Sequence, residues 1–213
     1  MLSLVIILSL SYLVGSIPTS IVISKLLKGI DIREHGSGNA GGTNTYRILG
    51  RNAALIVVVV DVMKGLVAAL FISQIRIGGE ALPISEKYHA VMYMAGLAAV
   101  IGHIWTIFAG FRGGKGVATG MGMVLGTLPG GILIGLPVFI LIVSITGYVS
   151  LSSILSALAI PFAFVIMDET GLYNFSPVAI WFTIGLSALI VFAHRANIKR
   201  LMAGSENSFK KKN

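Results

Sequence analysis

Cysteine is absent from this 213-residue chain, and charged residues are scarce, at 11% of the total. Without cysteine there can be no disulfide, no thiolate nucleophile and no thiolate metal ligand. Hydrophobic residues make up 55% of the sequence and the mean hydropathy is +0.91, which is more apolar surface than a water-soluble fold can bury. These values indicate an all-α, polytopic membrane helix bundle, and the length predicts a single domain over 1–213.

Signatures of several common binding and catalytic sites are also missing. There is no G-x-S-x-G elbow of a serine hydrolase. The run GSGNAG at 36–41 fits the dinucleotide template G-x-G-x-x-G, but no strand precedes it. The run GGKG at 113–116 lacks the hydroxyl side chain that a Walker A loop places after its lysine. We therefore expect no cofactor, no metal site and no nucleic-acid partner.

Four apolar runs are each long enough to cross a bilayer as a helix. About 20 apolar residues span the hydrocarbon core at a rise of about 1.5 Å per residue. The candidates are Leu2 to Ser24, Ala53 to Ile75, Tyr88 to Ala109 and Pro177 to Ala193. The first run lacks a basic start and exceeds the length of a signal peptide, so we expect it to be retained as a span.

The segment from Val117 to Met167 contains 51 residues without one charged side chain. This length allows either one span with irregular structure or three short spans. Pro129-Gly130-Gly131 and Gly147-Tyr148 divide the segment into three pieces, because proline lacks an N–H and glycine loosens a helix. We therefore predict three short helices here and seven transmembrane helices in all, with five as the alternative.

Lysine and arginine are distributed unevenly among the predicted loops. Thirteen of the sixteen fall after the first span, after the third span or in the tail from Arg195, whereas only Arg76 and Lys87 fall on the other side. Cytoplasmic loops carry the positive excess, so we expect the N-terminus outside and the C-terminus in the cytoplasm. This orientation requires an odd number of spans, and seven spans would place Ser150 on the cytoplasmic side.

Two glycine-rich runs fall on the predicted cytoplasmic side, GSGNAGGTN at 36–44 and FRGGKG at 111–116. Because glycine has no Cβ, its N–H group can approach a phosphate closely, and Arg112 and Lys115 would supply the opposite charge. The segment HRANIKRL at 194–201 falls on the same side. We infer an anion pocket at a membrane surface.

Three polar residues inside the predicted spans allow two interpretations. Asp61 and Lys64 are three residues apart on one helical face, so they can pair and reduce the cost of burying charge. A structural ion pair is favoured over a catalytic one. His103 lies near the cytoplasmic end of the third span, where a structural histidine and a site residue fit equally well.

The polar motifs indicate a small phosphorylated substrate at the lipid interface, and the apolar helices offer grooves for an acyl tail. This combination fits an enzyme that joins a water-soluble phosphate compound to a lipid chain, or a small-anion membrane transporter. A transporter site would lie near the bilayer midplane in related halves, and the sequence contains no internal repeat. A structural scaffold would not explain the glycines beside Lys115.

Ordered motifs run along nearly the whole chain. They are GSIP at 15–18, GSGNAGGTN followed by Tyr46-Arg47, Asp61 with Lys64-Gly65, GHIW at 102–105, GGKGVAT at 113–119, Gly147-Tyr148 with Ser150-Leu151, HRANI at 194–198 and Gly204-Ser205-Glu206. In this order and spacing the sequence resembles the bacterial acyl-phosphate:glycerol-3-phosphate acyltransferases, small integral membrane enzymes of phospholipid synthesis. Thr106 departs from the family pattern, which usually has proline after the tryptophan.

The resemblance implies transfer of a fatty acyl group from acyl phosphate to the 1-hydroxyl of sn-glycerol 3-phosphate. The products would be lysophosphatidic acid and phosphate, in the first acylation step of bacterial phospholipid synthesis. The protein would be a multi-pass protein of the bacterial inner (plasma) membrane, in contact with membrane lipid, with its active site facing the cytoplasm. Functional coupling to the enzyme that makes acyl phosphate is a further expected partnership, and one domain with every motif could act as a monomer.

The resemblance also assigns the site residues. The catalytic candidates are Lys115, Ser150, His194 and Asn197. The expected shell around the substrate phosphates is Ser37, Gly38, Asn39, Thr43, Asn44, Arg47, Arg112, Gly113, Gly114 and Gly116, and the further motif residues are Asp61, Lys64, His103 and Glu206. The chain has no His-x4-Asp pair, the base arrangement of many other glycerolipid acyltransferases. The identity of the general base therefore stays open, with His194 as one candidate and a phosphate oxygen of a bound substrate as another.

Overall fold

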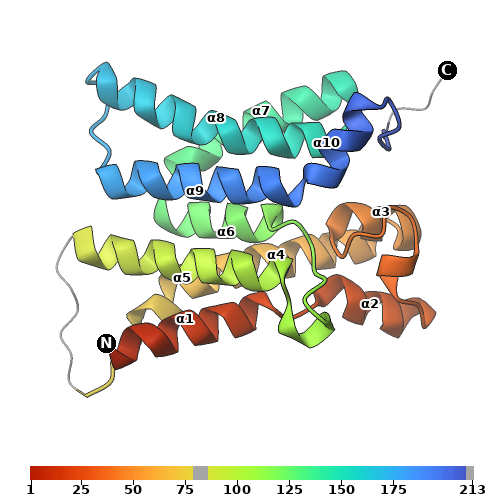
Figure 1. Ribbon diagram of the computed structural model, residues 1–213, viewed down its shortest axis with the longest axis horizontal. Coiled ribbons are helices and arrows are strands. Elements are labelled where there is room, and N and C mark those ends of the chain that lie inside the picture. The colour runs from red at the N-terminus through yellow and green to blue at the C-terminus, as the bar shows by residue number, and fades with distance from the viewer. Residues whose placement is uncertain (79–85, 210–213) are drawn as a thin grey trace. The chain divides into compact units, whose positions relative to one another are not determined.

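The computed structural model describes residues 1–78 and 86–209, and within these ranges all regular structure is helical (Figure 1). The chain divides into two compact units, Met1–Thr127 and Leu128–Asn213, called here the first and the second unit. The helical content agrees with the predicted all-α membrane protein. The expectation of one domain over 1–213 stays a prediction.

The first unit is a bundle in which α4 and α5 are central, since α4 packs against α1, α5 and α6, and α5 packs against α1 and α6. Its elements are α1 (Leu2–Gly15), α2 (Thr19–Lys28), η1 (Ile32–Glu34), α3 (Gly42–Leu49), α4 (Arg51–Leu70), η2 (Ile72–Gln74), α5 (Glu86–Ile104), η3 (Ile107–Ala109) and α6 (Val117–Thr127). Small residues let the backbones approach one another. A Cβ atom on Gly65 would overlap the carbonyl oxygen of Thr119, and one on Gly122 would overlap that of Val62.

The first predicted span contains a break. α1 ends at Gly15 and α2 begins at Thr19, because Pro18 lacks the N–H that a continuous helix would use. At the break, side chains from distant segments donate to the carbonyl oxygens of Ser16 and Ile17, and the latter also accepts from the N–H of Thr19 at 3.0 Å. Thr106 Oγ1 donates to Ser16, and Lys64 Nζ donates to Ile17 at 2.6 Å. The predicted run from Leu2 to Ser24 is thus two helices joined by a fixed bend.

The second unit contains α7 (Gly130–Thr146), α8 (Val149–Glu169), α9 (Pro177–Ala193) and α10 (Arg195–Met202), with α8 packed against both α7 and α9. The three predicted helices between Val117 and Met167 are confirmed as α6, α7 and α8. The breaks fall at the predicted positions, and Gly147 ends α7 with a φ of 74°, a left-handed conformation that favours glycine.

Four described segments are long and apolar enough to cross a membrane, namely Leu2–Lys28, Arg51–Gln74, His89–Ala109 and Val149–Glu169. A fifth would be α9 with α10, which are bent by 60° at His194. α6 and α7 are shorter apolar helices. An integral membrane protein follows from this composition, while the number of seven spans stays a prediction.

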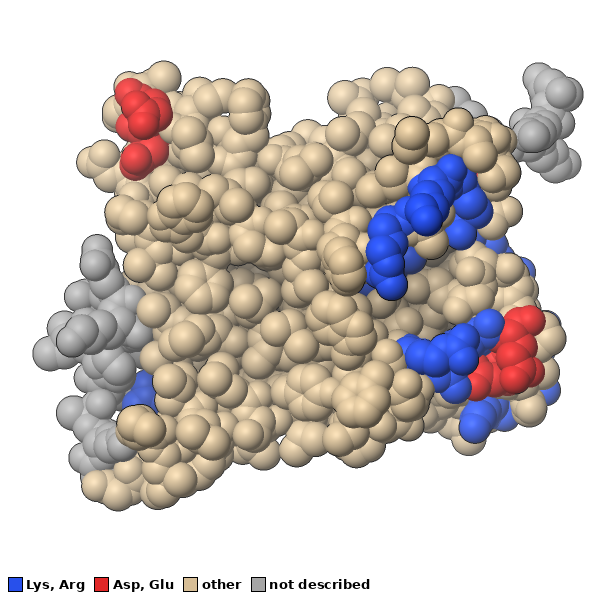
Figure 2. All heavy atoms as spheres, in the orientation of Figure 1, with Lys and Arg blue, Asp and Glu red and all other residues tan. Residues whose placement is uncertain are grey.

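Charge is separated along the second unit, which carries Asp168 and Glu169 at one end and Arg195, Lys199 and Arg200 at the other (Figure 2). In the first unit, Arg33 lies in η1 between Asp31 and Glu34, and Arg112 and Lys115 follow η3. Figure 2 shows such a mixture of blue cationic and red acidic side chains. The side chains of Glu86 and Lys87, and residues Glu80 and Lys210, Lys211 and Lys212, lie outside the described part of the chain. The predicted orientation in the membrane therefore stays a prediction.

Candidate active site

The two glycine-rich runs lie against each other in the first unit. A Cβ atom placed on Gly114 would be 2.6 Å from the carbonyl oxygen of Ala40, so only glycine allows this approach. Arg33 also links the two loops, because its Nη1 donates to the carbonyl oxygen of Ala109 at 2.7 Å. The anion-pocket hypothesis requires the two runs to meet, and they do.

The first run is shaped by Asn44, whose side chain is fully buried at the start of α3. Its Oδ1 accepts from the N–H of Ser37 at 2.9 Å, and its Nδ2 donates to the carbonyl oxygens of Ile32 and His35 at 3.0 and 2.9 Å. The amide is therefore committed to the loop. Asn44 thus holds Ser37, while a direct contact of Asn44 with a substrate phosphate stays a prediction.

The remaining predicted residues of this run border the same loop. Gly38 has a φ of 71°, the left-handed conformation that an L side chain rarely adopts. The side chains of Ser37, Asn39, Thr43 and Arg47 are half-buried, and Thr43 and Arg47 lie on α3. These four residues keep partial access to a ligand, as phosphate contacts require.

The second run packs onto the end of α5. The N–H groups of Gly113 and Gly114 donate to the carbonyl oxygens of Ile104 and His103, each at 3.0 Å. A Cβ atom on Gly113 would overlap the His103 carbonyl oxygen, and one on Gly114 would overlap the His103 ring. These two N–H groups therefore have partners in α5, and their contact with a phosphate stays a prediction. The glycines allow close packing, which places Lys115, half-buried, ahead of α6.

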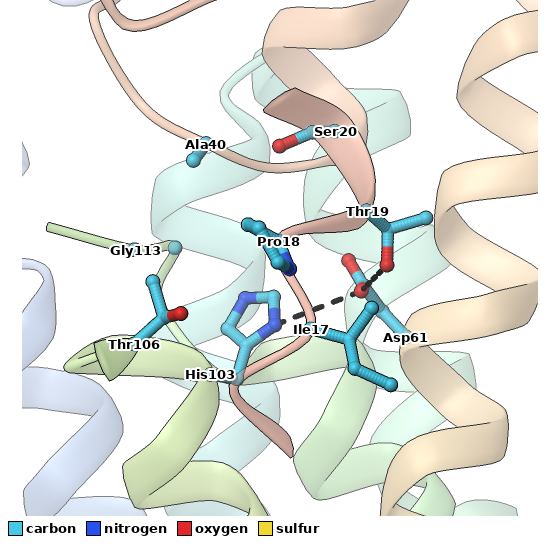
Figure 3. Close-up of a pocket in the computed structure, with 10 residues that line it drawn as sticks. Ile17, Pro18, Thr19, Ser20, Ala40, Asp61, His103, Thr106 and Gly113 are labelled. Atoms are coloured by element: carbon cyan, nitrogen blue, oxygen red, sulfur yellow. Dashed lines mark hydrogen bonds and ion pairs between the residues drawn. The ribbon is translucent and has the colours of Figure 1, made fainter. Parts of the chain in front are cut away.

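A buried charge cluster supports this loop from beneath (Figure 3). Lys64 Nζ lies 2.6 Å from Asp61 Oδ1, and each side chain is only 3% exposed, so the predicted ion pair is confirmed. Thr19 Oγ1 donates to the same oxygen at 3.2 Å, and His103 Nδ1 lies 3.7 Å from it. The other face of the His103 ring meets Gly114. His103 therefore connects the buried carboxylate to the loop that carries Lys115.

A small pocket opens beside this cluster and reaches both glycine-rich runs (Figure 3). The residues that line it are Ile17, Pro18, Thr19, Ser20, Ala40, Asp61, His103, Thr106, Gly113 and Gly114. The bend at Pro18 thus contributes to the same region as the two loops. His103 both contacts the buried Asp61 carboxylate and lines the pocket, so a structural role and a site role both stay predictions for it.

In the second unit, the carboxylate of Glu206 accepts hydrogen bonds from three side chains. Its Oε1 accepts from Ser150 Oγ at 2.9 Å and from Asn197 Nδ2 at 2.7 Å, and its Oε2 accepts from Arg200 Nε at 2.7 Å. The Glu206 side chain is only 5% exposed. Burial by itself would raise the pKa of Glu206, but the hydrogen bonds from Asn197, Arg200 and Ser150 together lower it below its usual value. Glu206 is therefore a carboxylate that holds α8 and α10 together.

His194 lies at the bend between α9 and α10 and is buried. Its Nδ1 lies 2.8 Å from the carbonyl oxygen of Ile190, a geometry that requires the proton on Nδ1. In the neutral ring, Nε2 is then the nitrogen with acceptor character. This tautomer is the one that a general base acting through Nε2 needs.

A model of the glycerol-3-phosphate acyltransferase family matches residues 5–204. This chain belongs to that family. The acyltransferase of Chlorobaculum tepidum is 46% identical over the full length of both chains, and that of Chlorobium phaeobacteroides strain BS1 is 43% identical over 99% of this chain and 98% of its own. Two crystal structures of the integral membrane glycerol 3-phosphate acyltransferase PlsY (YgiH) align with TM-scores of 0.81 and 0.79. They are 35% and 34% identical to this chain, covering 98% of it and 96% of PlsY.

The family resemblance stated from the motifs is therefore confirmed, and this integral membrane acyltransferase acylates glycerol 3-phosphate. Family membership sets aside the alternative of a small-anion transporter. Within this acyltransferase, the structure brings the predicted site residues together in two sets. One set in the first unit surrounds the glycine-rich runs, and the other in the second unit surrounds Glu206.

Three residues that contact predicted site residues were not among the candidates from the sequence, although Arg200 lies in the segment HRANIKRL. Arg200 pairs with Glu206, Thr19 donates to Asp61, and Arg33 bridges the two glycine-rich loops. The motif GSIP ends one residue before Thr19, and HRANI ends two residues before Arg200. Their neighbours therefore carried a signal. Arg33 had none, because its partners Ala109 and Arg112 are more than 70 positions away in the sequence.

Proposed function

We propose that this acyltransferase takes its acyl group from acyl phosphate and transfers it to the 1-hydroxyl of sn-glycerol 3-phosphate. The hydroxyl oxygen forms a bond to the acyl carbon, the bond from that carbon to the phosphate oxygen breaks, and the hydroxyl gives up its proton. The products are lysophosphatidic acid and inorganic phosphate. The two PlsY structures are a glycerol 3-phosphate form and a lysophosphatidic acid form, which supports this substrate and this product.

The meeting of the two glycine-rich loops is the observation that carries the proposal. Both substrates bear a phosphate, so the site must hold two anions side by side and screen their repulsion. Lys115 and Arg112 come from one loop and Arg47 from the helix that follows the other. Charge-assisted hydrogen bonds from these side chains, with Ser37, Asn39 and Thr43 around them, would bind the two phosphates.

Acyl phosphate is already activated, so the enzyme needs chiefly to position the reactants and stabilise the oxyanion. Correct positioning can lower a barrier by roughly 7–11 kcal/mol. The proposed mechanism requires neither a covalent acyl-enzyme nor a metal ion. In this scheme Lys115 binds a phosphate, and Gly38, Gly113, Gly114 and Gly116 shape its surroundings.

His194 and Asn197 are the predicted groups for the acceptor hydroxyl. Asn197 donates through Nδ2 to Glu206, which leaves its Oδ1 as the end that can accept a hydrogen bond from the hydroxyl. His194, with its proton on Nδ1, can accept the hydroxyl proton at Nε2. The alternative acceptor is a phosphate oxygen of a bound substrate. Ser150 and Glu206 hold Asn197 in place.

We also propose that the acyltransferase has seven spans in the bacterial inner membrane, with its N-terminus outside and its active site facing the cytoplasm. The division into α6, α7 and α8 and the basic end of each unit support this topology. In this setting the protein would act as a monomer in contact with membrane lipid. It would receive acyl phosphate from the enzyme that produces it.

A reconstituted assay tests the donor. Purified protein mixed with glycerol 3-phosphate and synthetic palmitoyl phosphate should form lysophosphatidic acid and release phosphate, with no CoA and with a chelator present. Palmitoyl-CoA and palmitoyl acyl carrier protein are the comparison donors. Product from either thioester but not from palmitoyl phosphate would show that the proposed donor is wrong. Loss of activity in the chelator would show that a metal is needed.

A further inference from the structure

Arg33 joins the two glycine-rich loops through one side chain. Its Nε and Nη2 donate to the carboxylate of Asp31, at 3.0 and 2.7 Å to the nearer oxygens. Its Nη1 donates across the chain to the carbonyl oxygen of Ala109 at 2.7 Å and to that of Arg112 at 3.4 Å. One guanidinium therefore connects the segment that leads into Ser37 with the segment that leads into Lys115.

The planar guanidinium is suited to this contact. It presents five N–H donors in a fixed fork, so one edge can bind a carboxylate while the remaining donors point elsewhere. Asp31 orients the fork and also caps η1, because its Oδ1 accepts from the N–H of Arg33 at 3.0 Å. The Arg33 guanidinium lowers the pKa of Asp31 to about 2, so the carboxylate is charged at neutral pH. The ion pair between Asp31 and Arg33 is therefore formed at neutral pH.

The loop that receives Arg33 is otherwise held by backbone hydrogen bonds, and at its start the N–H groups of Ala109 and Phe111 donate to the carbonyl oxygen of Thr106 at 3.2 and 2.8 Å. Gly110 and Phe111 follow one another in the left-handed region, with φ of 65° and 58°, and three glycines surround Lys115. Such residues lose much conformational entropy when ordered. Gly113 and Gly114 are tied to α5 through backbone hydrogen bonds. Arg33 adds a side-chain contact from the Ser37 loop to the first half of this loop, so Lys115 follows a segment held at both Ala109 and Gly114.

We propose that Arg33, oriented by Asp31, is a positioning residue that fixes the Lys115 loop against the Ser37 loop so that the cations of the site meet a substrate phosphate. The inference rests on the proposed function and extends it to residues outside the family motifs. Arg33 acts through the two loops and does not contact the reacting atoms.

Steady-state kinetics with palmitoyl phosphate and glycerol 3-phosphate test the role. We expect Arg33→Gln to lower kcat/KM by about 10- to 100-fold, the loss that a small misplacement of a catalytic group can cause. Asp31→Asn should give a smaller loss in the same direction. The matched control is Lys25→Gln, which removes an exposed charge that acts on the same Asp31 carboxylate from a distance and should change kcat/KM less than twofold.

A double-mutant cycle separates positioning from a general loss of stability. Lys115→Arg keeps a cation in the loop but should lower kcat/KM. In the double variant with Arg33→Gln, the fold loss in kcat/KM should be smaller than the product of the two single fold losses, because both substitutions act on the same contact. Arg33→Lys keeps the charge but not the fork, so it should recover only part of the loss. Independent losses in the cycle, or full recovery by lysine, would overturn the proposal.

Limited proteolysis gives a readout that does not depend on the donor. Trypsin cleaves after Arg112 and Lys115, and a loop released from Arg33 should be cut several-fold faster in Arg33→Gln than in the wild type or in Lys25→Gln. If the wild-type protein is inactive with palmitoyl phosphate but Arg33→Gln is still cut faster, the proposed donor is wrong and the positioning role of Arg33 stands. If Arg33→Gln shows the cleavage rate and the kinetics of the wild type, the positioning role of Arg33 is wrong, while the proposed donor stands.

Discussion

Lys115 and His194 have different tasks in the proposed chemistry, and single substitutions can distinguish them. Lys115 lies between two glycines in a loop that is fixed on α5, whereas His194 lies at the end of α9 with its Nδ1 used by a carbonyl oxygen. We expect Lys115→Ala to lower kcat/KM by about 10²–10³-fold, because a preorganised positive donor is lost. His194→Ala should cost much less if a substrate phosphate can take the proton. Equal losses would identify His194 as an essential base.

The single carboxylate of Glu206 makes the free energy of unfolding depend on pH. Its pKa is lower in the folded protein than its usual value, so its contribution is complete above that usual value and is lost as the pH falls through the folded pKa. Glu206→Gln keeps an acceptor for Asn197 and Ser150 but loses the ion pair with Arg200. Removing a hydrogen bond to a charged group costs about 1.5–3 kcal/mol.

Thermal unfolding in detergent measures this effect. The wild type should lose stability between neutral and acidic pH, and Glu206→Gln should unfold at a lower temperature at pH 7 with a flatter dependence on pH. Asp168→Asn is a control carboxylate in the same unit. A Glu206→Gln variant with the wild-type curve would show that the charge of Glu206 and its ion pair with Arg200 contribute nothing to folding.

At the scale of elements, the close contact of α4 and α6 depends on glycine. A Cβ atom on Gly122 would overlap the backbone of Val62, which cannot move aside easily, whereas a Cβ atom on Gly185 in α9 would meet nothing within 4 Å. Overpacking of this kind costs about 1–3 kcal/mol. Gly122→Ala should therefore lower the unfolding temperature, and Gly185→Ala should leave it unchanged or raise it. Equal effects of the two substitutions would contradict the packing argument.

The helices were predictable where a breaker acts locally. Pro129 precedes the first residue of α7 and Gly147 follows its last, so the division of 117–167 into three helices needed no tertiary information. The bend at Pro18 was not predicted, although proline is the same kind of signal. An isolated proline can kink or break a helix. Here the break is stabilised by Thr106 and Lys64, which come from distant segments.

At the scale of the whole molecule, topology can be tested cleanly because the chain contains no cysteine. Single cysteines at Thr127 and Tyr148, on either side of α7, should be labelled from opposite faces of the membrane if there are seven spans. A membrane-impermeant maleimide applied to oriented vesicles measures this. Labelling of both positions from the same face would show that α7 does not cross the membrane.

The sequence by itself determined the membrane class, the helical breaks within 117–167, the ion pair of Asp61 with Lys64 and, through its motifs, the acyltransferase family. These features depend on composition and on short spacings, which can be recognised in the sequence without knowledge of the fold. Only the tertiary structure decided that Asn44 shapes its own loop, that the N–H groups of Gly113 and Gly114 are used by α5, and that Arg33 connects the two runs. The physical reason is that a hydrogen-bonding group serves whichever partner lies within about 3 Å, and distant segments of the chain supply those partners.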